Sequence, residues 1–217
     1  MLNDVASTSI EQESKKGQLI KGWRLLTSTP VLRQIAKIDV LETIAGAVWV
    51  AAIILVFVTE GLNRDERWWG FINGAFCFGL IIGSIYCVKY ASYIERKLSS
   101  VIFWSSISSF LVTLLFSFNQ IPSFAMLLSM LIGFFGQLKS IPQQTVIQTS
   151  VPREELSSVY TSLGAVSTGM FGLASLVMGI AADLIGVRAV FVISAVFLGW
   201  ASLLVFKHKP LFAMNAE

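Results

Sequence analysis

Long apolar segments alternate with short polar connections along most of this chain. The segments that lack any charged residue run from Thr43 to Thr59, Gly70 to Val88, Leu98 to Leu138, Leu156 to Ala182 and Ala189 to Phe206. A helix that crosses about 30 Å of hydrocarbon needs about 20 mostly apolar residues. The pattern therefore predicts a series of membrane-spanning helices.

The third of these segments, Leu98 to Leu138, is about twice as long as one crossing requires. Asn119-Gln120-Ile121-Pro122 near its middle is typical of a turn, so we divide the segment into two spans. The segments are apolar on all sides, whereas the strands of a membrane barrel alternate apolar and polar residues. We therefore expect an all-α membrane protein, a bundle of six transmembrane helices over residues 38–207, whose first span runs from about Ile38 to Glu60.

The two ends of the chain differ from this bundle. Residues 1–17 are rich in Ser, Glu, Gln, Asn and Lys, which predicts a disordered cytoplasmic tail or linker. Residues 18–37 form an amphipathic segment, because Leu19, Ile20, Trp23 and Leu26 recur at helical spacing. This favours a short interfacial helix on the inner leaflet, with a plain juxtamembrane linker as the alternative. Residues 208–217 are expected to form a second cytoplasmic tail.

Composition and charge support a membrane location. The chain has 217 residues, of which 55% are hydrophobic and 13% charged, with a mean hydropathy of +0.73. A water-soluble domain of this composition would lack the polar surface to cover itself. Of the 16 Lys and Arg residues, only Arg64, Arg67 and Arg188 fall in connections at the end of the bundle away from the termini. The positive-inside rule then places both termini in the cytoplasm, and the basic residues predict no nucleic-acid partner.

The last outer turn carries a motif. It reads Gly179-Ile180-Ala181-Ala182-Asp183-Leu184-Ile185-Gly186-Val187-Arg188. Two helices end here, Gly186 can adopt a positive φ, and Asp183 and Arg188 are close enough in sequence to pair or to cap a helix. By itself this motif predicts a tight turn between two helices.

Together with Thr145-Val146-Ile147-Gln148-Thr149-Ser150-Val151-Pro152-Arg153-Glu154-Glu155-Leu156, this turn resembles the carboxy-terminal half of transporters of the major facilitator superfamily. The closest likeness is to the efflux branch that includes macrolide and siderophore exporters. The stretch from Gly22 to Arg33 is similar to that family's central cytoplasmic linker. Of the family's inner-loop signature, Arg96 and Lys97 match, while other residues stand where the family has Asp and Arg.

The resemblance implies alternating access, in which two six-helix bundles rock about a site at the middle of the membrane. This chain would form one bundle. Its implied partners are the lipid bilayer, a missing amino-terminal six-helix half or an equivalent, and a small-molecule substrate. The implied function is proton-coupled efflux of a small amphiphilic solute through the bacterial inner membrane.

A rival interpretation is a non-transporting membrane scaffold, or a truncated or split product, that packs with a partner bundle through glycine faces. Glycines recur at four-residue spacing in the second predicted span and are frequent in the fifth. They are Gly70, Gly74, Gly79 and Gly83, and then Gly164, Gly169, Gly172 and Gly179. Such spacing lets another helix approach closely.

Two acids are the candidates for proton or cation coupling. Asp39 and Glu42 are three residues apart, so they lie on one side of a helix. An acid within a span is a candidate for ion coupling by default. Because both lie near the expected inner boundary, pairing with Lys37 is an equally good interpretation.

Four further polar residues within the spans are candidates for a cavity or gate. Lys139 can pair with an acid of the missing half, or extend its amine to the membrane boundary. Asn73 and Gln137 can hydrogen-bond a substrate or another helix. Gln144 is expected at the inner mouth of the cavity.

Nothing in the sequence favours an enzyme. There is no H-E-x-x-H helix, no G-x-S-x-G turn and no phosphate-binding loop. Cys77 and Cys87 are about 15 Å apart along one predicted helix, which is too far for a disulfide. With these two cysteines and one histidine, we expect no metal site and no cofactor.

Overall fold

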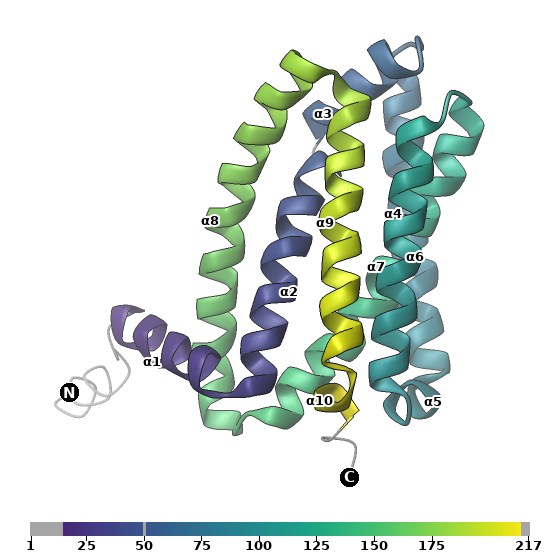
Figure 1. Cartoon of the computed structure of the whole chain (residues 1–217). Coiled ribbons are helices and arrows are strands. Elements are labelled where there is room, and N and C mark those ends of the chain that lie inside the picture. Colours follow the sequence, from purple (N-terminus) through teal and green to yellow (C-terminus); the bar gives the residue numbers. More distant parts are fainter. Residues whose placement is uncertain (1–14, 50, 214–217) are drawn as a thin grey trace, which may run out of the picture.

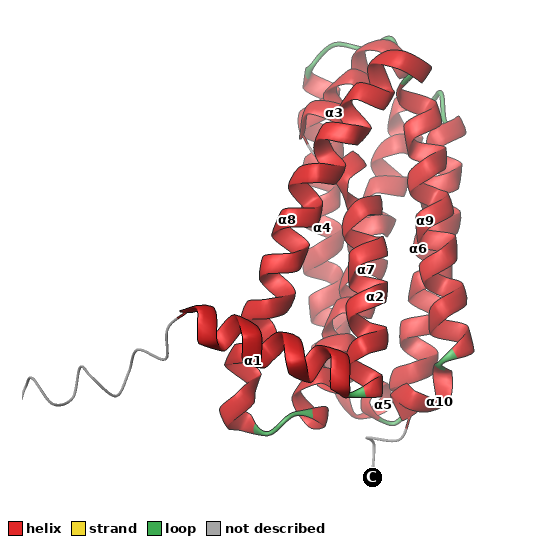
Figure 2. Cartoon of the chain, turned by 60° about the vertical axis from the view of Figure 1, so that its left-hand side comes forward, coloured by secondary structure: helices red, strands yellow, loops and turns green. Residues whose placement is uncertain are grey.

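The computed structural model describes residues 15–49 and 51–213, and within them the chain is helical with no strand (Figure 2). The long helices are α1 (Lys15–Ser28), α2 (Pro30–Gly46), α4 (Arg67–Lys89), α6 (Leu98–Phe118), α7 (Pro122–Ser150), α8 (Arg153–Ile185) and α9 (Val187–Lys207). The short ones are η1 (Ala47–Trp49), α3 (Ala51–Val56), η2 (Phe57–Gly61), α5 (Ala91–Glu95) and α10 (Lys209–Ala213).

Five of these helices, α4 and α6 to α9, are long and apolar enough to cross a membrane. Two further helical pieces, Pro30–Trp49 and Ala52–Gly61, are bent by 46° relative to each other, and together they are long and apolar enough to be a sixth candidate span. The prediction of an all-α membrane protein is therefore confirmed, and the six predicted spans correspond to these five helices and the bent pair.

The division of the long apolar segment at Asn119 is also correct. The Asn119 side chain bonds the backbone two residues ahead through Nδ2 to Ile121 O (2.9 Å) and through Oδ1 from Ile121 N (3.0 Å). This short-range turn separates α6 from α7, and Pro122 occupies the first helical position of α7, where a missing N–H costs nothing. The two helices then pack against each other as neighbours.

The helices form one bundle in which α7 packs against both α4 and α6, and α9 packs against α6 and α2. α2 also contacts α8. Figure 1 shows that α8 and α9 meet at one end and diverge toward the other, with α2 between them. Buried apolar side chains form two clusters, one at each end, and the aromatic rings of Phe57, Phe116 and Phe191 contact one another within the first. α1 and α10 lie at the same end of the bundle (Figure 1).

The amino-terminal boundary differs from the prediction. α2 begins at Pro30, eight residues before the expected start of the first span, because proline is favoured at a helix start. α1 lies across the end of the bundle (Figure 2) and packs on α8. The apolar residues that predicted this helix do not share one environment: Leu26 is buried, whereas Ile20 and Trp23 are 70% and 55% exposed.

The predicted tails lie partly outside the described residues, at 1–14 and 214–217. Their described parts are mostly helical, whereas we expected a disordered tail or linker over residues 1–17. Residues 15–17 belong to α1, and residues 209–213 form α10. Phe212 in α10 is almost fully buried in the cluster at this end of the bundle. The second tail is therefore anchored to the bundle by at least one apolar side chain.

Candidate functional site

An ion pair joins two helices inside the bundle. Glu42 Oε1 on α2 lies 2.9 Å from Lys139 Nζ on α7, and the two side chains are only 13% and 11% exposed. Glu42 therefore pairs with Lys139 rather than with Lys37, and the acid beside Lys139 belongs to this same chain. Lys37 is five residues away on the same helix, which directs it about 140° around the axis from Glu42, and it is exposed.

A cavity of about 250 Å³ lies beside this pair, between α2, α4, α6, α7 and α9. Its walls include apolar side chains such as Phe76 and Leu198, and also Ser109 and Thr113 of α6. Thr113 is fully buried, and its hydroxyl has no hydrogen-bond partner within the described part of the chain. A buried hydroxyl without a partner, next to an ion pair, makes this cavity polar enough to hold water or a small polar group.

Asp39 and Gln144 are brought together at a second cavity. This one has a volume of about 260 Å³ and lies between α2, α7 and α8. Ser167 Oγ on α8 donates a hydrogen bond to Asp39 Oδ2. Gln144 Nε2 lies 3.3 Å from Ser140 Oγ on the same helix. Asp39 and Glu42 thus share one helix but line two neighbouring cavities.

Asn73 and Gln137 line neither of these two cavities. Asn73 Nδ2 donates to the Trp69 backbone carbonyl one turn earlier at 2.8 Å. Gln137 Nε2 donates to Ser84 Oγ at 2.9 Å and so links α7 to α4. We expected these residues to hydrogen-bond either a substrate or another helix. Gln137 bonds another helix, whereas the Asn73 bond lies within α4.

The predicted glycine faces divide into two groups. A Cβ at Gly79 would collide with the Met130 backbone carbonyl of α7, and one at Gly83 would come within 2.9 Å of Phe134 O. These two glycines therefore allow α4 and α7 to approach closely, as expected. The remaining ones would have no atom within 4 Å of an added Cβ. They are Gly70, Gly74, Gly164, Gly169, Gly172 and Gly179.

The outer turn confirms one expectation and corrects another. Gly186 has φ +87°, the positive value that the motif predicted. Arg188, however, does not pair with Asp183. Arg188 lies in the first turn of α9 and donates through Nη1 to Ser117 O at 2.9 Å and through Nη2 to Gly61 O at 2.7 Å. Asp183 is exposed on the last turn of α8, whereas the Arg188 guanidinium is directed to the carbonyls of α6 and η2.

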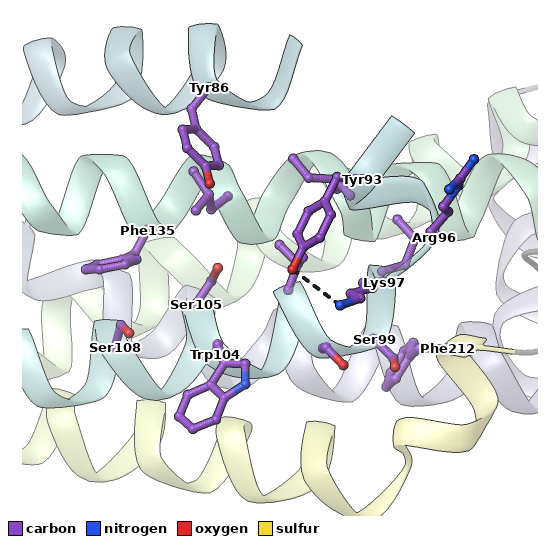
Figure 3. A pocket seen from close by; sticks show the side chains of 15 residues that line it. Tyr86, Tyr93, Arg96, Lys97, Ser99, Trp104, Ser105, Ser108, Phe135 and Phe212 are labelled. Carbon is purple, nitrogen blue, oxygen red and sulfur yellow. Dashed lines mark hydrogen bonds between the residues drawn. The ribbon is translucent and has the colours of Figure 1, made fainter. Parts of the chain in front are cut away.

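The inner-loop residues Arg96 and Lys97 follow α5 and are both exposed. They line a crevice of about 520 Å³ (Figure 3). Lys97 Nζ donates to Tyr93 Oη at 3.4 Å and lies 4.9 Å from the centre of the Tyr93 ring. This crevice is separate from the two cavities on α2.

Sequence reasoning missed the hydroxyl groups that line the interior. Ser105, Ser109, Thr113 and Ser117 recur every fourth residue on α6 and are all buried. That spacing places them along one side of a helix. The signal was present in the sequence, but the serines were too common in this apolar segment to suggest a polar interior. Among the described residues, no group of three or more His, Cys, Asp or Glu could hold a metal ion.

These features define an integral membrane protein: a bundle of apolar helices with a buried charge pair and small polar cavities. The model of the Major Facilitator Superfamily matches residues 14–213, and the chain belongs to this family. Family membership favours a transporter over an enzyme.

Three proteins of Bacillus subtilis (strain 168) are similar to this chain. It is 34% identical over 173 residues to the uncharacterized MFS-type transporter YjbB, covering 80% of this chain and 43% of that protein. It is 30% identical over 188 residues to the uncharacterized MFS-type transporter YfmI, covering 87% and 46%. The similarity to YvqJ, with the same description, is 25% over 181 residues. The chain thus spans less than half the length of these relatives. No solved structure matches it.

Proposed function

We propose that this chain is the carboxy-terminal half of an alternating-access transporter that exports a small amphiphilic solute in exchange for protons. Two facts support a half rather than a whole transporter. The chain covers 43% of YjbB and 46% of YfmI. It has at most six candidate spans within its described residues. A second six-helix bundle would complete the two-bundle architecture on which alternating access depends.

The observation that carries the proposal is the ion pair of Glu42 and Lys139 inside the spans. Acids and bases within a membrane are costly and mark ion or proton pathways. As long as Glu42 is ionised, it holds α2 to α7 through Lys139. A proton on Glu42 removes its charge and weakens this link, which frees the two helices to move relative to each other. The ion pair would thus couple protonation to a change between two conformations.

The cavity with Asp39 and Gln144 supports a solute path along α2, α7 and α8. Its polar side chains come from all three helices, and Ser167 connects Asp39 to α8. α8 also carries Gly164, Gly169 and Gly172, and a Cβ added at any of them would have no atom of another described helix within 4 Å. We propose that this side of α8 contacts the other half.

The proposed location is the bacterial inner membrane, with both termini in the cytoplasm. The distribution of Lys and Arg supports this orientation. To test it, Asp65→Cys and Ser92→Cys are placed singly in a chain that carries Cys77→Ala and Cys87→Ala. An impermeant maleimide added to intact cells should label the cysteine at position 65 and should reach position 92 only after the cells are opened. The opposite labelling pattern would invert the orientation.

Transport is tested by co-expressing the chain with a six-span half encoded beside it and measuring efflux of a panel of dyes, with and without a proton gradient. Glu42→Gln should abolish the gradient-dependent part of efflux. Asp183→Asn, which removes an exposed acid at the far end of α8, is the matched control and should leave efflux unchanged. Gradient-dependent efflux that survives Glu42→Gln would remove the proposed coupling role. A pair that inserts and associates but moves no solute would favour the scaffold interpretation.

A further inference from the structure

The crevice at Arg96 and Lys97 has the geometry of a lipid site. α4 and α6 both pack on α7, and the crevice lies between them with Phe135 and Leu138 of α7 as its floor. Figure 3 shows Tyr86 on one side and Trp104 on the other, with Tyr93 of α5 and the following Arg96 and Lys97 at one end. One end of the crevice is therefore cationic and the rest is lined mainly by aromatic and aliphatic side chains.

The cationic end carries charge that is not neutralised. Neither Arg96 nor Lys97 forms an ion pair with an acid in the part of the chain that the structure describes. Both side chains are exposed, and the Tyr93 hydroxyl lies beside Lys97. In Figure 3 the Arg96 side chain points away from Lys97, so this exposed guanidinium must turn toward the crevice for both cations and the Tyr93 hydroxyl to meet one phosphate group.

The apolar part of the crevice opens on the side of the bundle. Trp104 is 64% exposed, although it lies two turns inside a membrane-spanning helix. Val88, at the end of α4, is 78% exposed. Apolar side chains that are exposed at this depth face lipid rather than water. A ligand that reaches both ends of the crevice must then have a charged head and an apolar chain.

We infer that this crevice binds an anionic phospholipid, with its phosphate against Arg96, Lys97 and the Tyr93 hydroxyl, and an acyl chain along Trp104, Phe135 and Leu138. A free anion would use only the cationic end, and a zwitterionic lipid would gain less from two uncompensated positive charges. This site is separate from the Glu42 and Asp39 cavities, so it does not depend on the transport mechanism proposed above.

The test is lipid titration of the purified full chain in detergent, with bound lipids counted by native mass spectrometry. Phosphatidylglycerol should bind more tightly than phosphatidylcholine, by about tenfold or more for two cations near the headgroup. Arg96→Gln combined with Lys97→Gln should reduce this preference to about twofold or less. Ser108→Trp, which narrows the crevice without changing charge, should weaken phosphatidylglycerol binding while the protein still elutes as one species.

The matched control is Arg33→Gln with Lys37→Gln. It removes the same two charges from exposed positions at the same end of the bundle, beside a different groove. This variant should keep the lipid preference. Equal loss in both double variants would mean that total charge, not the crevice, attracts the lipid, and would overturn the inference. So would an unchanged preference after loss of Arg96 and Lys97, or displacement of the lipid by inorganic phosphate.

The position of the acyl chain has its own readout. Brominated phosphatidylglycerol quenches tryptophan fluorescence at short range, so a chain in the crevice should quench Trp104. The quenched fraction should fall in Trp104→Phe and should not fall in Trp200→Phe, which removes an exposed tryptophan on α9 that lines the other groove. Equal quenching of the wild type and Trp104→Phe would place the lipid elsewhere and overturn the proposal.

Discussion

Glu42 on α2 and Lys139 on α7 lie 2.9 Å apart, with little of either side chain exposed. The two residues are far apart in sequence and belong to different spans, so the pair connects two helices across the interior. A buried pair contributes little net free energy, because desolvation of both charges offsets their attraction. Loss of only one partner is costly, since the other charge then stays buried alone.

Lys139→Met should therefore lower the free energy of unfolding by about 3 kcal/mol, because it leaves Glu42 without its partner. Glu42→Gln combined with Lys139→Met should be less destabilising than Lys139→Met alone. Thermal unfolding in detergent micelles measures both. If Lys139→Met is as stable as the wild type, the ion pair does not hold α2 to α7.

The close contact of α4 and α7 depends on Gly79. Gly79→Ala should destabilise the protein by about 1–3 kcal/mol, because the new methyl group would overlap the Met130 carbonyl and force the helices apart. Gly74 lies on the same helix, and a Cβ added there would have no atom within 4 Å. Gly74→Ala should therefore change the free energy of unfolding by less than about 0.5 kcal/mol. The two unfolding temperatures compared side by side provide the measurement. Similar losses in both variants would contradict the packing of α4 on α7 described here.

Arg188 connects the ends of three elements at the outer end of the bundle. Arg188→Gln should lower stability by about 2 kcal/mol, because the carbonyls of Ser117 and Gly61 lose charged hydrogen-bond donors. Arg188→Lys should not restore it fully, since an ammonium cannot reproduce the two-pronged geometry of the guanidinium. Asp183→Asn, at the exposed end of α8, is expected to be neutral. Thermal unfolding that ranks Asp183→Asn with Arg188→Gln would instead indicate a functional Asp183–Arg188 pair.

Gly186 joins α8 to α9 with φ +87° and ψ 148°, a conformation that is almost confined to glycine. Gly186→Ala should therefore cost about 1–3 kcal/mol. Gly179 lies within α8 with open space around it. Gly179→Ala should therefore leave the free energy of unfolding unchanged or raise it slightly, because alanine favours a helix. Thermal unfolding of the two variants under the same conditions measures both effects. Equal losses would show that alanine is poorly tolerated at both glycines and that the positive φ of Gly186 is not the cause.

Several features of the fold follow from local sequence. Charge-free segments of sufficient length, Pro122 after Asn119, and Gly186 between two apolar segments predict the α6 to α9 spans and two of their turns. Such predictions succeed because the length of an apolar segment and the conformational freedom of glycine or proline depend on the residues themselves. The predicted start of the first span, near Ile38, was less accurate. The helix begins at Pro30, and its first turns contain polar residues that the apolar pattern did not include.

The sequence by itself determined that the chain is a bundle of membrane-spanning helices, that Gly186 turns with a positive φ, and which polar residues lie within the spans. Only the tertiary structure decided that Glu42 pairs with Lys139, that Arg188 binds Ser117 and Gly61, and that Gly79, but not Gly179, packs against another helix. The reason is geometric. Each residue turns a helix by about 100°, so the partner of a side chain depends on how each helix is rotated and tilted in the bundle, and the spacing within one helix does not contain that information.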